Sequence, residues 1–110
     1  MIVIPKEIEL KNDTYYFECC AGLGDTMLTC GYMDALLEKY QAPIRLIVKP
    51  SHAFIPEMYD IDNFLVLGNS LNENFIRKHT KSTPQKGKIY AASPNKHPEM
   101  WDYFKPMYYL

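Results

Sequence analysis

The chain has almost no net charge, since 12 Lys and Arg residues stand against 13 Asp and Glu residues in 110. A dedicated nucleic-acid-binding domain normally carries a strong basic excess, so this balance argues against nucleic acid as a partner. The charge is less evenly spread locally, because no acid occurs between Arg77 and Lys96. This basic stretch is interpreted as a solvated loop, with an anion-facing rim as the alternative.

Cysteine is scarce, and its spacing excludes two classes of small protein. The three residues are Cys19, Cys20 and Cys30, an odd number without a C-x-x-C pair. Adjacent cysteines point to opposite faces of a strand, so the pattern supports neither a zinc site nor a disulfide framework. We therefore expect reduced thiols, no bound metal and a cytoplasmic location.

Long hydrophobic runs are also missing. No apolar segment approaches the roughly 20 residues of a transmembrane helix. The apolar start, residues 1–4, meets Pro5 and then charged residues, so no signal peptide is expected. A composition of 47% hydrophobic and 23% charged residues is ordinary for one globular domain, which is the organisation we predict over residues 1–110.

Strand-like and helix-like segments alternate along the chain. Strands are expected at 2–10, 14–20, 44–48, 63–67 and 88–92, with a turn at 11–13 and a loop at 82–87. Helices are expected at 26–41, 52–59, 70–80 (helix or turn) and 98–105. Such alternation implies crossover connections and an α/β, Rossmann-like fold, with a largely parallel sheet and the first strand antiparallel at an edge. The apolar C-terminal end is expected either to dock on the sheet or to meet a second domain or a second copy.

Glycine is rare, with five residues, and two of them share one turn. Gly22 and Gly24 follow an apolar strand and open a helical pattern. This order places backbone N–H groups at a helix N-terminus, where a negative charge or the polar groups of a sugar or nucleotide can bind. The unusual residue is Asp25, an acid where a phosphate-binding turn prefers a small neutral or a basic residue.

Several nucleotide-binding motifs fail at this turn. A dinucleotide fingerprint needs a third glycine where Met27 stands, and an acid where the second strand ends in Lys49. A P-loop would need G-K-[ST], which is absent. Residues 18–24 are closer to the E-x-G-x-G-x-G turn of methyltransferases, with Cys20 at the first glycine. That class also needs an acid after the second strand, where this chain has Lys49. A fragment of an S-adenosylmethionine-dependent methyltransferase is therefore the third functional hypothesis, after the two described below.

A family resemblance fits the turn better. Residues 22–29, Gly-Leu-Gly-Asp-Thr-Met-Leu-Thr, are followed by 32–36 and by a strand that ends in Lys49-Pro50-Ser51-His52. Together they resemble the front of the heptosyltransferase-like glycosyltransferases (family nine, GT-B fold), which carry a G-x-G-D turn and a second strand with a basic end. The resemblance covers roughly residues 15–68, and nothing outside that range matches.

The resemblance implies a function for this half of the chain. Members have two Rossmann-like domains, and the first one holds the acceptor while the second one grips a nucleotide-sugar donor. Transfer inverts the anomeric centre without a metal ion or a cofactor. Asp25 would be the general base, and the residues expected to contact the substrate are Gly22, Leu23, Gly24, Thr26, Lys49, Ser51 and His52, with Thr29 as a further hydroxyl donor. The acceptor would be a sugar or a glycolipid, the latter implying peripheral contact with the inner face of the membrane.

Other interpretations stay open. Asp25 is also a favoured helix N-cap residue, which needs no chemistry. Lys49 can be a solvated strand end, and His52 a residue that starts a helix. A module that binds a sugar or a phosphate without turnover is the second functional hypothesis. Because one domain cannot supply both halves of a cleft, we expect a truncated product or a small stand-alone relative with little transferase activity by itself.

Overall fold

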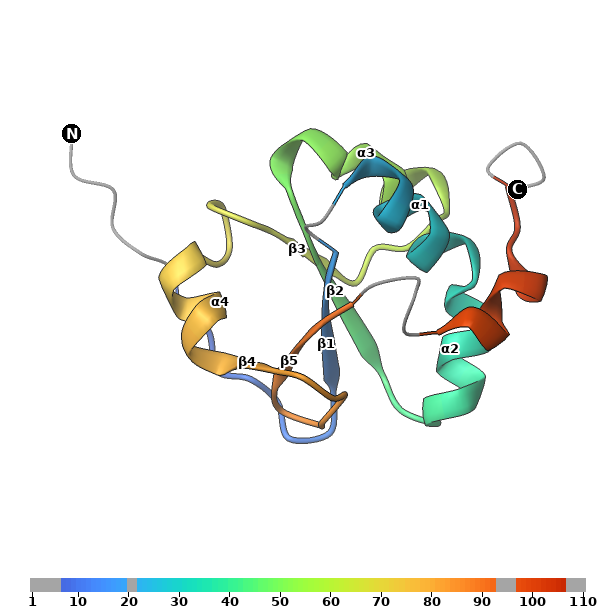
Figure 1. Ribbon diagram of the computed structural model, residues 1–110. Helices are drawn as coiled ribbons and strands as arrows, with labels where there is room; N and C mark the ends of the chain where they lie inside the picture. Colours follow the sequence, from blue (N-terminus) through green and yellow to red (C-terminus); the bar gives the residue numbers. More distant parts are fainter. Residues whose placement is uncertain (1–6, 20–21, 93–96, 107–110) are drawn as a thin grey trace.

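The computed structural model describes residues 7–19, 22–92 and 97–106, and it confirms the predicted α/β class (Figure 1). Five strands form one sheet in the order β3-β2-β1-β5-β4, and all neighbours are parallel. This arrangement is compatible with a Rossmann-like fold. The strands are β1 (Tyr15–Cys19), β2 (Ile44–Val48), β3 (Phe64–Val66), β4 (Thr80–Lys81) and β5 (Ile89–Ala91).

Helices cover both faces of the sheet. On one face, Phe17 and Leu46 pack against the two helices that follow β1, the helix before β3 and the C-terminal segment. On the other face, Tyr16 and Ile47 pack against the helix that precedes β4. Their bounds are α1 (Leu23–Gly31), α2 (Met33–Tyr40), α3 (Phe54–Met58) and α4 (Glu73–His79), with 3-10 helices η1 (Pro50–His52) and η3 (Pro98–Tyr103).

The central strands are built as their sequences predict. β2 reads Ile-Arg-Leu-Ile-Val, and only Arg45 in it is not buried. Continuous burial of this kind is typical of a parallel strand covered on both sides. In β1 the side chains alternate, so that Tyr16 and Phe17 lie in the cores on opposite faces. β1 pairs with β2 on one side and with β5 on the other, so the strand order reverses at β1.

The predicted first strand is wrong for residues 7–10, which form no strand, and residues 2–6 lie outside the described part of the chain. The sheet explains this difference, because both edges of β1 are already occupied by parallel neighbours. The turn is confirmed at residues 12–13, where Thr14 N donates to Lys11 O (3.3 Å). The segment before β1 is held by a side chain and not by strand pairing, since Lys11 N donates to the Tyr16 hydroxyl (2.9 Å).

The predicted helix at 26–41 begins three residues earlier and is interrupted at Tyr32. The C-terminal segment lies against this break. Lys105 N donates to Gly31 O (2.9 Å), and the Phe104 ring packs on Gly31. The second half ends at Gln41, which caps α2 in the left-handed conformation, as expected before Pro43.

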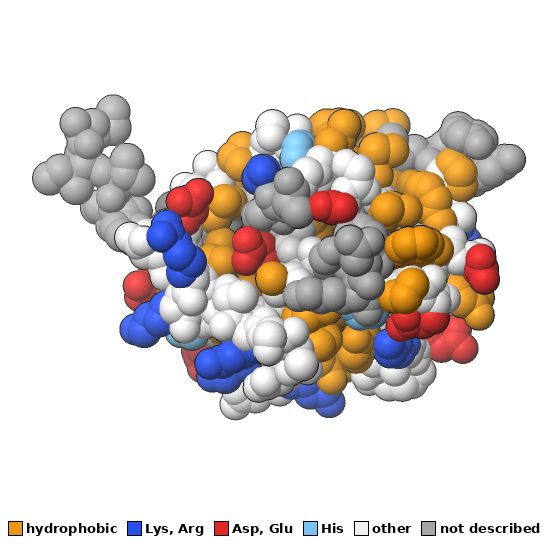
Figure 2. All heavy atoms as spheres, viewed as in Figure 1, with side chains coloured by type: hydrophobic (Ala, Val, Ile, Leu, Met, Phe, Trp, Pro, Cys, Tyr) orange, Lys and Arg blue, Asp and Glu red, His pale blue; other side chains and the backbone are white. Residues whose placement is uncertain are grey.

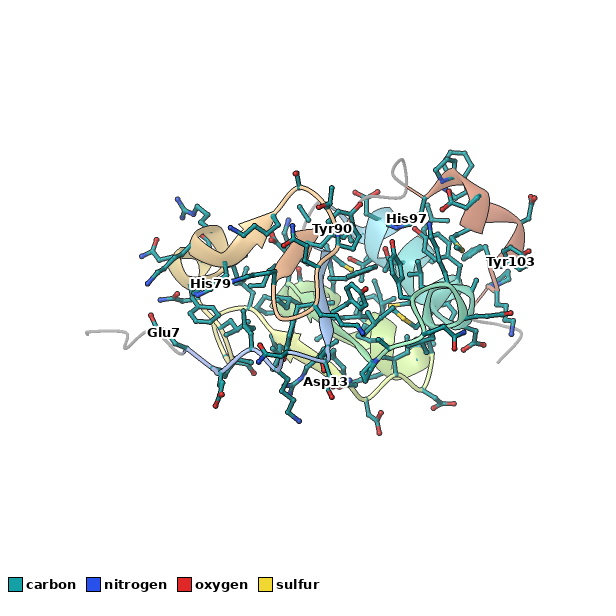
Figure 3. The ribbon with its side chains drawn as sticks, turned by 90° about the horizontal axis from the view of Figure 1, so that it is seen from below. Glu7, Asp13, His79, Tyr90, His97 and Tyr103 are labelled. Atoms are coloured by element: carbon teal, nitrogen blue, oxygen red, sulfur yellow. The ribbon has the colours of Figure 1, made fainter. Side chains whose placement is uncertain are left out.

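The C-terminal residues dock on the domain, although they form a 3-10 helix instead of an α-helix. His97 is buried (4% exposed) and stacks on Phe17, and the Tyr40 hydroxyl lies 2.9 Å from His97 Nε2 (Figure 3). Pro98 occupies the first turn of η3, as predicted. Trp101 and Tyr103 stay half or more exposed, and residues 107–110 lie outside the described part.

Replacing Gly31 with alanine is expected to lower the free energy of unfolding by about 1–2 kcal/mol. A Cβ at this position would overlap the Phe104 ring and lie 3.2 Å from Lys105 O. This overlap outweighs the helix propensity that alanine gains. Urea unfolding measures the loss. The double variant Gly31→Ala/Phe104→Ala should lose less free energy of unfolding than the sum of the two single losses. Strict additivity would contradict this steric explanation.

Candidate functional site at the carboxyl edge of the sheet

A hollow of about 720 Å³ lies where the parallel strands end. In open parallel sheets, ligands bind outside the carboxyl ends of the strands, at the point where the strand order reverses. Here that point is between β1 and β5, and both strands contribute to the hollow. Its described lining is Glu18, Lys49, Leu67, Glu73, Ile76, Arg77, Thr80 and Ala91.

The hollow belongs to the face of the sheet that α4 covers. Glu18 follows Phe17 in β1, so its side chain points to the α4 side, where Ile76 packs. The Lys49 side chain lies at the end of β2 on that same side. Figure 2 shows basic side chains gathered over α4 and the loop before β5, and hydrophobic side chains over α1 and η3.

Two basic and two acidic side chains line the hollow. Arg77 and Glu73 form an exposed ion pair along α4 (3.4 Å), which is worth little in water. Lys49 is half-buried and takes part in none of the ion pairs between described residues. Its ammonium is therefore available to an anionic group of a ligand.

Asp25 lies in the first turn of α1, two residues inside the helix. Its interpretation as the N-cap residue is wrong, because Gly22 holds that position and no side chain caps the helix. Asp25 is half-buried, and a carboxylate in a first turn is stabilised by the helix dipole. The Asp25 carboxylate therefore lies at the N-terminal end of α1.

The fold's own packing does not require glycine at either position of the turn. Gly22 is extended (φ −176°), and apart from the chain neighbours and the backbone of α1, no described atom lies within 4 Å of the place where a Cβ would be at either glycine. Leu23, between them, is 47% exposed. Space is thus open on the outside of the turn, where a ligand can approach the backbone.

The two threonine hydroxyls are used within the protein. Thr26 is fully buried, and its Oγ1 donates to Cys19 O (3.0 Å) and Gly22 O (3.1 Å), joining the start of α1 to the end of β1. Thr29 Oγ1 donates to Asp25 O (2.9 Å). Both hydroxyls therefore hold the turn in place through backbone carbonyls of the protein itself.

Ser51 and His52 lie in η1, directly after Lys49. Ser51 is exposed, and His52 is half-buried. His52 Nδ1 is buried without a hydrogen-bond partner among the described residues, while its backbone N donates to Lys49 O (3.0 Å). The residues that follow β2 therefore share one tight segment, but only Lys49 enters the hollow.

The structure thus brings some of the predicted residues to one edge of the sheet and separates others. Lys49 lines the hollow, whereas the described lining does not include Asp25, whose helix covers the opposite face. Sequence reasoning missed Glu18, and it considered Arg77 only as part of the basic stretch with an anion-facing rim as the alternative. A signal existed for Glu18, because it is the one charged residue in the apolar strand Tyr15–Cys19.

Cys19 and Cys30 are buried, and neither belongs to the described lining of this hollow. Burial raises the pKa of the Cys30 thiol to about 12, so it stays protonated at neutral pH. Within residues 7–19, 22–92 and 97–106, no three His, Cys, Asp or Glu residues gather closely enough to hold a metal ion. Over the same ranges, no helix has the length and apolarity needed to cross a bilayer.

Comparisons of the chain with models of known protein families, with curated proteins and with solved structures found no match. The resemblance to heptosyltransferase-like enzymes therefore rests on the motif alone.

Proposed function

We propose that this chain is the acceptor-binding domain of a metal-independent, inverting glycosyltransferase, and that its acceptor is a phosphorylated sugar. The observation that carries the proposal is the hollow at the carboxyl ends of the parallel strands, with the Lys49 ammonium in its lining. A position at the reversal of strand order supports ligand binding there, and an available cation supports an anionic ligand.

Charge divides the edge into two parts. The Asp25 carboxylate at the start of α1 disfavours a phosphate there, although the helix dipole by itself would attract one. A phosphate is therefore expected beside Lys49, and a sugar hydroxyl beside Asp25. As an ionised carboxylate, Asp25 could take the proton of that hydroxyl when its oxygen attacks the anomeric carbon of the donor. The donor itself would be held by a second domain.

Glucose 6-phosphate serves as the probe, with glucose as its uncharged counterpart. We expect saturable binding of the phosphate, followed by NMR, with shifts at the amides of Lys49 and of residues 22–25. Changing Lys49 to glutamine should weaken binding about tenfold, the effect of losing one charge-assisted hydrogen bond. The matched control is Lys86→Gln, which removes the same charge from an exposed loop residue and should change affinity less than about twofold.

Two results would contradict the proposal. Equal weakening by the Lys49 and Lys86 variants would show a general charge effect instead of a site. Tight binding of S-adenosylmethionine, with no response to the sugar phosphate, would favour the methyltransferase alternative. Nucleotide sugars are expected to bind this chain weakly, because the donor-binding part is supplied by the second domain.

A binding module without turnover is the second candidate, and the place of Asp25 outside the described lining favours it. The variant Asp25→Asn separates the two, because asparagine keeps the size of the side chain but cannot accept a proton. In the acceptor domain, it should retain sugar-phosphate binding and abolish transfer once a donor domain is supplied. In a binding module, wild type and variant would behave alike in both assays.

A further inference from the structure

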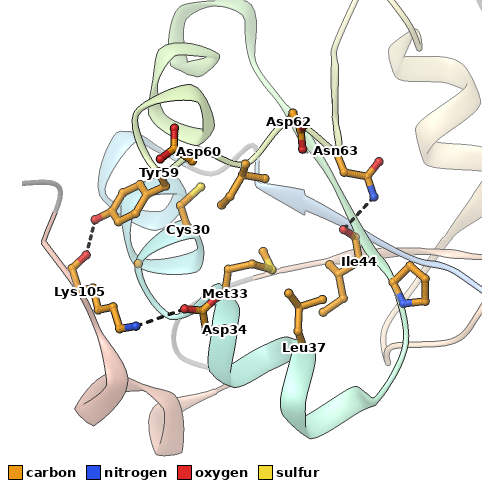
Figure 4. A pocket seen from close by; sticks show the side chains of 13 residues that line it. Cys30, Met33, Asp34, Leu37, Ile44, Tyr59, Asp60, Asp62, Asn63 and Lys105 are labelled. Atoms are coloured by element: carbon orange, nitrogen blue, oxygen red, sulfur yellow. Dashed lines mark hydrogen bonds and ion pairs between the residues drawn. The ribbon is translucent and has the colours of Figure 1, made fainter. Parts of the chain in front are cut away.

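A second hollow, of about 330 Å³, lies at the other end of β2 (Figure 4). It is bounded by α2, by the turn between α3 and β3, and by the C-terminal segment. Ile44 begins β2 and lines this hollow, whereas Lys49, which follows the last residue of β2, lines the carboxyl-edge hollow. At about 3.3 Å per residue, these positions are roughly 16 Å apart along the strand. The two hollows are therefore separate sites.

The inner part of this second hollow is apolar. Met33 and Leu37 come from α2, Ile44 from β2 and Ile61 from the turn before β3. Cys30 adds a thiol that burial keeps protonated, since its pKa is raised to about 12. Small-molecule sites are typically apolar hollows of about 300–1,000 Å³ with a few polar groups at the rim. This hollow fits that description at the lower end of the size range.

The polar groups at the rim are mainly acidic. Figure 4 shows Asp60 and Asp62 on one side of the hollow and Asp34 on the other. Among the described residues of the lining, the one ammonium is that of Lys105, which already pairs with Asp34 (3.2 Å). Asp60 and Asp62 thus have no cation beside them in the described lining, and the rim is complementary to a positive charge.

The backbone fixes the rim. Asp60 has φ +56°, a left-handed conformation that favours glycine, at the end of α3. Ile61 N donates to Pro56 O (2.8 Å) and closes this turn. On the opposite side, the Tyr59 hydroxyl donates to Lys105 O (2.6 Å), and Lys105 N donates to Gly31 O (2.9 Å). The hollow is therefore preformed, which lowers the entropy cost of binding a ligand.

We infer that this hollow binds a small organic cation, an amine carried on a compact apolar body, whose ammonium lies between Asp60 and Asp62. The apolar body fills the space between α2 and β2. A phenylalkylamine is small enough for a hollow of this size. This inference stands independently of the proposed function, because the described linings of the two hollows have no residue in common.

Three probes with one apolar body and different charge test the inference: 2-phenylethylamine, 2-phenylethanol and 3-phenylpropionate. Titration by NMR should give saturable binding of the amine, with shifts at Met33, Ile44 and Ile61. The alcohol should bind about five- to tenfold more weakly, and the acid should not bind detectably. Equal binding of all three probes, or shifts elsewhere on the surface, would overturn the inference.

The double variant Asp60→Asn/Asp62→Asn should lower the affinity for the amine about five- to tenfold and leave the alcohol unchanged. The control Glu7→Gln/Glu9→Gln removes two exposed acids beside Arg45, away from this hollow, and should leave both affinities within about twofold. Thermal unfolding of each variant shows that the fold is retained.

A loss of alcohol binding as well as amine binding would mean that the hollow had changed shape, and Leu37→Lys then provides the second test. Its ammonium should compete with the amine at the rim, and unchanged binding would contradict the site.

Discussion

Replacing Phe17 with alanine is expected to lower the free energy of unfolding by about 3–5 kcal/mol. The side chain is fully buried at the centre of β1, so the change leaves a large cavity between the sheet and the helices. Its ring also meets Tyr90 edge-on (5.2 Å between centroids), meets Tyr40 edge-on (5.8 Å) and stacks on His97 (6.1 Å). One residue thus joins β1, β5, α2 and the start of the C-terminal segment.

Urea unfolding followed by circular dichroism measures this loss, and Phe17→Leu is the matched control. Leucine keeps most of the volume and loses the ring contacts, so it should cost about 1 kcal/mol. Because a domain of this size has a total stability of about 5–15 kcal/mol, the alanine variant should unfold at a much lower urea concentration. A loss below about 1 kcal/mol for alanine would contradict the central packing of Phe17.

The domain is expected to lose stability at alkaline pH, chiefly through Cys30. Burial raises the pKa of the Cys30 thiol from its ordinary value of 9.0 to about 12 in the folded state. The stabilisation is complete below pH 9, where both states hold the proton. Between pH 9 and pH 12 the unfolded chain releases the proton while the folded chain keeps it, so the free energy of unfolding falls as pH rises. Each pH unit in this window costs about 1.4 kcal/mol.

Urea unfolding at intervals from pH 8 to pH 11, in a reducing buffer, tests this expectation. Cys30 alone should lower the free energy of unfolding by about 3 kcal/mol over that interval. Tyr32 acts in the same direction, since burial raises its pKa to about 12. The variant Cys30→Val removes the thiol and should therefore show a clearly shallower decline. Equal slopes for the wild type and this variant would contradict the assignment.

Local patterns predicted the parts of the fold whose causes are local. The mostly continuous apolar run Ile44–Val48 predicted β2 and its burial on both faces, and the alternation of elements predicted the parallel sheet. The break at Tyr32 could not be predicted, because it involves Phe104 and Lys105, which are more than 70 residues away in sequence. β4 has only two residues, too few to leave a pattern.

The candidate site was predictable only in part for the same reason. The end of β2 predicted a basic residue at the carboxyl edge, and Lys49 lies there in the hollow. The side of the sheet could not be predicted, since α4 forms the opposite wall and its residues Glu73 and Arg77 come later in the chain. Asp25 was correctly expected near the start of a helix, but its place relative to the hollow depends on how α1 crosses the sheet.

The pairing of β1 has a consequence for folding during synthesis. Tyr16–Glu18 lie beside Ile89–Ala91, a partner that leaves the ribosome more than 70 residues later. Until then, a nascent chain can align β1 with β2 but leaves the other edge of β1 open, and open strand edges promote aggregation. Aggregation of the nascent chain is therefore expected to be most favoured in the interval before β5 is translated and covers that edge.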